Sequence, residues 1–136
     1  MVIRRFVCIL LALSLFFTCV VSALAVVEPQ YKYADDIQAY ISITGSKATV
    51  TGKIVPIGST ETRKASVTVY LQRKENGKWH SLDSWSGSAT NATARASGSK
   101  TIEKGYEYRA LAVGRISTAE GVLLERPTKA SSSQSY

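Results

Sequence analysis

The alternation of apolar and polar positions is most regular between residues 65 and 85. Val67, Val69 and Leu71 are separated by single polar or amphipathic residues, and this period of two is typical of a strand with one buried face. Asn76-Gly77 follows, a pair that accepts the positive φ angles of a tight hairpin turn. The pattern therefore predicts a β-hairpin on which the other strands are organised.

The returning arm of this hairpin carries Trp79, Leu82 and Trp85. Trp79 and Leu82 differ in parity, so either a β-bulge lies between them or one large side chain stays outside the core. Either tryptophan could fill the core. Trp85 is our structural candidate, and the choice between the two stays open at this point.

Further alternating segments lie on both sides of the hairpin, separated by turn residues and by polar connections. They predict strands at 37–44 and 48–55, a weak edge strand at 90–97, and strands at 102–113 and 122–126. No segment beyond residue 25 has helical periodicity. About seven short strands at this spacing predict an all-β fold, an antiparallel sandwich of the immunoglobulin or fibronectin III kind.

The N-terminus has the pattern of an export signal. Arg4 and Arg5 precede an apolar stretch at 6–21, and Ala23 and Ala25 are the small residues that a signal peptidase prefers. We therefore divide the chain into a helical signal peptide (1–25), an N-terminal arm (26–36), a sandwich domain (37–127) and a polar C-terminal tail (128–136). The alternatives are an uncleaved membrane anchor and, less favoured, a lipid at Cys19, which follows Phe-Phe-Thr rather than a lipoprotein motif.

Both cysteines, Cys8 and Cys19, lie within the signal, so the mature chain of 136 − 25 = 111 residues has none. Small exported domains of animals are usually held by disulfides, and a chain without them indicates a bacterial protein that depends on its apolar core. Removing Arg4 and Arg5 lowers the formal net charge from +7 to about +5. The basic residues are scattered rather than clustered, so we expect no nucleic-acid binding.

Residues 102–113 resemble the corner before the sixth strand of fibronectin III and immunoglobulin-like domains. The matching residues are Ile102, Gly105, Tyr108, Ala110 and Ala112. In those domains the hydroxyl of the tyrosine bonds to upstream backbone, which would make Tyr108 a structural residue here. The two alanines would leave room for a tryptophan. The cysteine pair of immunoglobulin domains is missing, so only the sandwich is implied.

Most of the mature chain also resembles a family of small exported proteins of Gram-positive bacteria that carries only a domain-of-unknown-function label. The resemblance rests on the segments YKY, IQAYISITGSKATVTGKI, VTVYLQRKENGKW, SLDSWS and GYEYRALAV. It implies secretion, with an extracellular or cell-wall location. It brings no catalytic residue and no ligand.

Catalytic and metal-binding chemistry has little support in the sequence. His80 is the sole histidine, and we expect it to be an exposed strand residue without the nucleophile and acid of a catalytic triad. Asp35-Asp36 lacks the spaced acidic loop of calcium sites. We therefore expect a non-enzymatic protein with no catalytic residues, no cofactor and no metal, and a hydrolase is the least favoured function.

The most suggestive functional feature is aromatic. Tyr40 and Tyr70 have the outward parity of their strands, and one exposed tryptophan of the hairpin would lie near two cations. Exposed aromatic rings beside cationic groups suit an anionic or sugar-rich polymer. The candidate ligand-contact residues are Tyr70, Arg73, Lys78, Trp79 and Tyr40.

The leading hypothesis is a binding module at or near the cell surface, with a cell-wall polymer, another glycan or a surface protein as partner. The alternative is a structural or protein-interaction module that associates through its sheet edges. We expect a monomer that contacts the membrane only through the signal segment, if that segment is kept.

Overall fold

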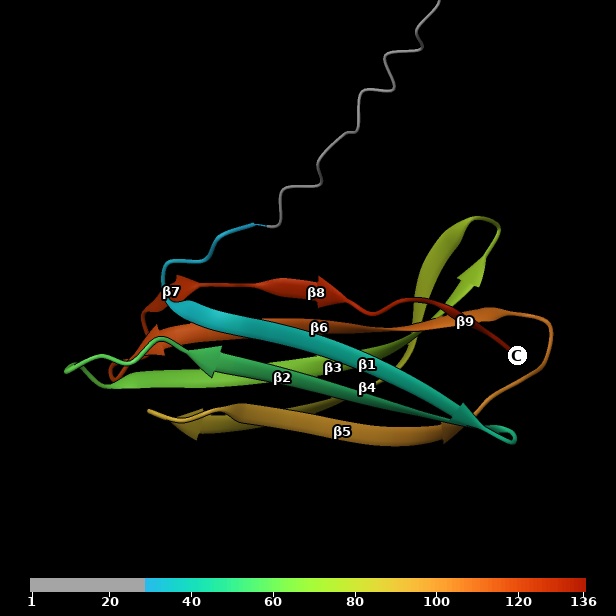
Figure 1. Cartoon of the computed structure of the whole chain (residues 1–136), viewed down its shortest axis with the longest axis horizontal. Helices are drawn as coiled ribbons and strands as arrows, with labels where there is room; N and C mark the ends of the chain where they lie inside the picture. The colour runs from blue at the N-terminus through green and yellow to red at the C-terminus, as the bar shows by residue number, and fades with distance from the viewer. Residues whose placement is uncertain (1–28) are drawn as a thin grey trace, which may run out of the picture.

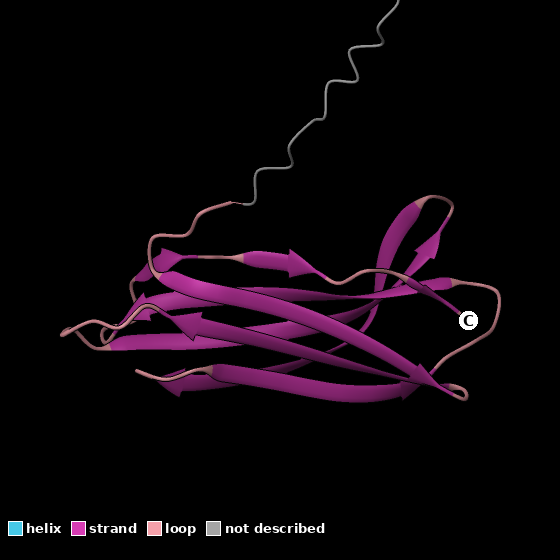
Figure 2. Cartoon of the chain, viewed as in Figure 1, coloured by secondary structure: helices cyan, strands magenta, loops and turns pink. Residues whose placement is uncertain are grey.

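The computed structural model describes residues 29–136, and every regular element in that range is a β-strand (Figure 2). The predicted signal peptide and the first residues of the predicted arm lie outside the described residues. The strands are β1 (Ala34–Thr44), β2 (Lys47–Pro56), β3 (Arg63–Glu75), β4 (Lys78–Thr90), β5 (Ala94–Thr101), β6 (Glu107–Thr118), β7 (Leu123–Glu125), β8 (Thr128–Ala130) and β9 (Gln134–Ser135).

The strands form two antiparallel sheets packed face to face, so the predicted sandwich is confirmed (Figure 1). One sheet has the order β1-β2-β5. The other has the order β4-β3-β6, and β7, β8 and β9 pair with successive stretches of β6. The first strand, β1, and the hairpin strand β3 lie in opposite sheets.

The core is built from alternate residues of the long strands, which explains the period of two in the sequence. On β2 and β3 the inward positions are almost fully buried and the outward positions are not. The buried apolar side chains of the long strands include Ile37, Ala48, Val50, Ile54, Ala65, Val67, Val69, Leu71, Tyr108, Ala110, Ala112 and Ile116.

The predicted hairpin is confirmed, and Asn76 and Gly77 form its turn with φ angles of 51° and 76°. A register shift lies between Leu71, which pairs with Asp83, and Gln72, which pairs with Ser81. Leu82 is therefore the extra residue of a β-bulge. The difference in parity between Trp79 and Leu82 is thereby explained. The bulge also places the two tryptophans on either side of it on opposite faces of the sheet.

Trp85 lies on the inner face opposite Val69, but it is only partly buried. A Cβ atom at Gly98 of β5 would come within 2.0 Å of its indole ring. The room for this tryptophan therefore comes from Gly98. Ala112, which was expected to leave room for a tryptophan, packs instead towards Gly52 of β2. Trp85 spans the gap between the edge strands of the two sheets.

The corner tyrosine has the predicted hydrogen bonds. Tyr108 is 0% exposed, its hydroxyl donates to the carbonyl oxygen of Glu103 at 2.6 Å, and it accepts from the Glu103 N–H at 3.1 Å. Both backbone groups belong to the loop that leads into β6. Tyr108 thus holds this loop against the core.

Several boundaries differ from the sequence prediction. The weak edge strand begins at Ala94 rather than at residue 90, because Thr90 still pairs with Lys64 and Asn91 turns the chain with a φ angle of 51°. Strand β1 begins at Ala34, inside the predicted arm. Residues 128–136, expected to be a polar tail, contain β8 and β9, and Figure 1 shows them running along the sandwich beside β6.

Candidate functional site

The outer face of the β4-β3-β6 sheet brings together aromatic and cationic side chains. Tyr70 and Lys74 share the outward parity of β3. Trp79 of β4 is paired with Lys74, and Arg109 of β6 is paired with Gln72, so both belong to the same face. We call the set Tyr70, Lys74, Trp79 and Arg109 the outer patch. Figure 1 shows the β3–β4 hairpin, which carries Tyr70, Lys74 and Trp79, bending away from the sandwich at its tip.

Arg109 is held in place by a chain of side-chain hydrogen bonds across three strands. Its Nε donates to Oε1 of Gln72 at 2.8 Å, and Nε2 of Gln72 donates to Oγ of Ser81 at 3.2 Å. Gln72 is only 7% exposed, which favours a single arrangement of this chain. The guanidinium carbon of Arg109 lies 4.4 Å from the centroid of the Trp79 ring, within the range of a cation–π contact.

The outer face is predominantly basic. Lys74 lies with its Nζ 5.8 Å from the Trp79 ring centroid and 3.7 Å from a carboxylate oxygen of Glu107. Burial lowers the pKa of Arg109, but an arginine remains charged at neutral pH. Among the outward positions of β3, β4 and β6, the basic residues are Lys64, Lys74, Arg109 and Arg115, and the acidic residue is Glu107.

Two of the predicted contact residues, Arg73 and Lys78, alternate to the opposite side of the hairpin. The guanidinium carbon of Arg73 lies 4.3 Å from the centroid of the Tyr106 ring, and the group pairs with Glu75 and, at 3.6 Å, with Glu103. Arg73 therefore ties the hairpin to the corner loop and does not join Tyr70.

Lys74 and Arg109 are the members of the outer patch that the sequence analysis missed. Lys74 follows Tyr70 by four residues and so shares its parity, a signal that was present in the sequence. Arg109 had no comparable signal, because its position beside Trp79 depends on the pairing of β6 with β3.

Tyr40 is 56% exposed, but it lies on β1 in the other sheet. Its hydroxyl donates to Oε1 of Gln38 at 2.6 Å. Tyr40 and Tyr70 therefore face away from each other on opposite sides of the sandwich. They cannot belong to one patch.

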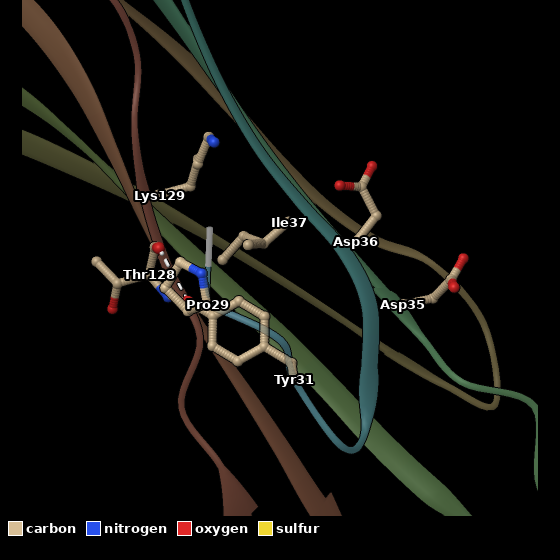
Figure 3. A pocket seen from close by; sticks show the side chains of 7 residues that line it. All are labelled: Pro29, Tyr31, Asp35, Asp36, Ile37, Thr128 and Lys129. Carbon is tan, nitrogen blue, oxygen red and sulfur yellow. Dashed lines mark hydrogen bonds between the residues drawn. The ribbon is translucent and has the colours of Figure 1, made fainter. Parts of the chain in front are cut away.

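A small pocket of about 130 Å³ lies between the N-terminal arm, β1 and β8 (Figure 3). The Tyr31 hydroxyl donates to the carbonyl oxygen of Thr128 and accepts from its N–H, both at 3.2 Å, which fixes the arm against β8. Asp35 and Asp36 also line the pocket, but Figure 3 shows their carboxylates pointing away from Tyr31. The pocket therefore presents no paired carboxylates to a ligand.

Catalytic and metal-ligating groups do not assemble in the described part of the chain. No set of three or more His, Cys, Asp and Glu side chains within residues 29–136 is grouped so that it could hold a metal ion. His80 is half exposed and its Nε2 lies 4.0 Å from a carboxylate oxygen of Glu75. Residues 29–136 also contain no helix long and apolar enough to cross a membrane.

Comparison with known proteins gives one weak likeness. No protein-family model matches the chain, and no curated protein matches it. A solved structure of Bacteroides uniformis beta-glucuronidase 2, covalently bound to cyclophellitol-6-carboxylate aziridine, is similar to this chain with a TM-score of 0.44 and 14% identity. The likeness covers 71% of this chain and 13% of that chain. A TM-score this low carries no argument about function.

Proposed function

We propose that this protein is a secreted, non-enzymatic binding module that holds an anionic glycan of the cell wall or cell surface on its outer patch. The observation that carries the proposal is the gathering of two aromatic rings and two cations on one face of the β4-β3-β6 sheet. Tyr40 is exposed on the outer face of the opposite sheet, but it makes no cation–π contact with any residue in the range 29–136.

The patch suits such a ligand for two physical reasons. The apolar face of a sugar ring packs on an aromatic ring, and Tyr70 and Trp79 are both partly exposed. A carboxylate or phosphate group on the polymer would pair with Arg109, whose planar guanidinium binds such groups through two parallel hydrogen bonds. Because Gln72 already fixes Arg109, less conformational entropy is lost on binding.

Co-sedimentation with insoluble cell-wall material of a Gram-positive bacterium tests the proposal. We expect weak binding at about 0.01 M ionic strength and its loss at about 1 M, where the Debye length falls from about 30 to about 3 Å. Tyr70→Ala should reduce binding roughly twofold to tenfold through lost stacking. Lys74→Gln should reduce it roughly twofold to fivefold, as expected for one exposed ion pair.

Matched variants on the other sheet provide the controls. Tyr40→Ala removes an equally large aromatic side chain, and Lys47→Gln removes an equal charge from the outward parity of β2. Both should bind like the wild type, and thermal unfolding should confirm that every variant is folded. Wild-type protein that stays in the supernatant at both ionic strengths would refute the proposal.

The alternative function, association through sheet edges, also has an observation in its favour. Among the described strands, β4 pairs only with β3, and β1 and β5 each pair only with β2, so both sheets have unpaired edges. Two features oppose it: the bulge at Leu82 distorts the edge of β4, and Asp83 forms an ion pair with Lys100 at 3.7 Å across this opening. Sedimentation velocity over a hundredfold concentration range distinguishes the two functions, since the edge model requires a dimer and the binding model a monomer.

A further inference from the structure

A shallow hollow of about 480 Å³ lies on the same outer face as the outer patch, near the other end of β3 and β4. Apart from one lysine, the side chains that line it are small, which is why the surface is recessed there. The lining residues are Lys64, Ser66, Ser88, Thr90 and Ser117, together with Ala65 and Ala89. We call this feature the hydroxyl hollow.

The hydroxyl groups of the hollow differ from the hydrogen-bonded threonine–serine pairs of the two sheets. Directly beside it, Thr68 and Ser86 are paired across β3 and β4 at 2.8 Å. On the other sheet, Thr49 and Ser99 are paired in the same way at 2.8 Å. In the hollow the residues are also opposite each other in register, but their side chains make no hydrogen bond within the described part of the chain.

The positively charged groups around the hollow are also available to bind a ligand. The Lys64 ammonium is exposed and forms no ion pair with any residue in the range 29–136. Arg115 is exposed on the neighbouring strand, in register with Ser66. The hollow thus combines unpaired hydroxyl groups with two positive charges, a combination that fits a polyhydroxylated anion.

The hydroxyl hollow and the outer patch lie along the same face of β3. Lys64 and Lys74 are ten residues apart, and a strand rises about 3.4 Å per residue, so the two lysines are roughly 34 Å apart along the strand. Tyr70 and the Thr68–Ser86 pair lie between them on the same face. A linear polymer that binds at Tyr70 and follows β3 past the Thr68–Ser86 pair would therefore reach the hollow.

We propose that the hydroxyl hollow is a second subsite that takes a distant unit of the same linear, polyanionic glycan. The inference rests on the proposed function of the outer patch. Lys64 pairs with an anionic group of that unit, and the serine and threonine hydroxyls exchange hydrogen bonds with its sugar hydroxyls. Because two linked contacts raise the effective concentration of the second, affinity depends on the length of the polymer.

Galacturonate oligomers of two lengths provide the test, with binding followed by isothermal titration calorimetry at low ionic strength. A trisaccharide reaches only the outer patch, and a chain of twelve units spans both sites. The longer chain offers more equivalent units that can bind, which by itself raises the apparent affinity. Wild-type protein should bind the longer chain more tightly than this statistical gain alone predicts. Lys64→Gln should weaken binding of the longer chain roughly twofold to fivefold and leave the trisaccharide unchanged.

The control is Lys47→Gln, which removes an equally exposed lysine from the opposite sheet and should bind both oligomers like the wild type. If Lys64→Gln and Lys47→Gln lower the affinity for the longer chain equally, only net charge matters and the subsite is refuted. If Tyr70→Ala weakens binding but Lys64→Gln does not, the outer patch is supported as a binding site and the hollow is refuted as a second subsite. If neither oligomer binds wild-type protein, both proposals fail.

Discussion

At the scale of single residues, Tyr108 contributes most clearly to the fold. Its ring is buried in the core and its hydroxyl serves both polar backbone groups of Glu103. A buried backbone group without a partner costs about 1–3 kcal/mol, so one phenol oxygen holds the whole corner in place. The residue was predictable from the sequence, because the corner motif is local and its spacing is contained in twelve residues.

Tyr108→Phe should therefore lower the free energy of unfolding by about 1–3 kcal/mol, since the ring remains but two backbone groups lose their partner. Urea denaturation measures the change. Tyr106→Phe is the matched control, because no hydrogen bond involves that hydroxyl within the described residues, and it should stay within about 0.5 kcal/mol of the wild type. Equal midpoints for the two variants would contradict the role of the corner hydroxyl.

The contact between Arg109 and Trp79, unlike the role of Tyr108, was not predictable from the sequence. The two side chains come from β6 and β4, and the strand between them supplies Gln72 as the link. Their meeting depends on the register of three strands, which side-chain periodicity alone does not specify. Parity predicted the face of Tyr70 correctly and could have predicted Lys74. The position of Arg109 beside Trp79 could be determined only from the structure.

At the scale of elements, the bulge in β4 decides which tryptophan lies on which face. The sequence indicated the conflict between Trp79 and Leu82 but left two solutions, because a bulge and an exposed side chain explain the same pattern. The structure has the bulge, with Trp85 inward over Gly98 and Trp79 outward on the patch. The role of Gly98 could not be predicted, since it depends on how the two sheets are packed.

The packing of Trp85 on Gly98 predicts a strong coupling between them. Trp85→Ala should cost about 2–4 kcal/mol, somewhat below the cost for a fully buried tryptophan because the ring is partly exposed. Gly98→Ala should cost about 1–3 kcal/mol, because its Cβ would overlap the indole ring.

In the double variant no indole ring remains for the new Cβ atom to overlap, so Gly98→Ala should cost little once Trp85→Ala is present. The coupling energy between the two substitutions, measured by denaturation, should be about 0.5–3 kcal/mol. Additive effects would mean that Trp85 does not cover Gly98.

At the scale of the whole molecule, the two outer faces of the sandwich differ in chemistry. Both carry paired hydroxyl groups, but one adds only Tyr40 as an exposed aromatic residue, whereas the other adds the outer patch and the hydroxyl hollow. The sequence predicted the sandwich, because it follows from the number and spacing of the strands. The predicted boundaries were less accurate at the C-terminal end, where short polar segments pair with β6 without an apolar pattern.

The most direct test of the account is a map of the binding face by nuclear magnetic resonance. Galacturonate chains of twelve units are titrated into ¹⁵N-labelled protein at low ionic strength, and backbone and indole N–H signals are followed. We expect shifts at Tyr70, at Arg109 and at the Trp79 indole, with none at Tyr40 and Lys47 on the opposite face. Shifts confined to the β1-β2-β5 sheet, or no shifts at saturating polymer, would contradict it.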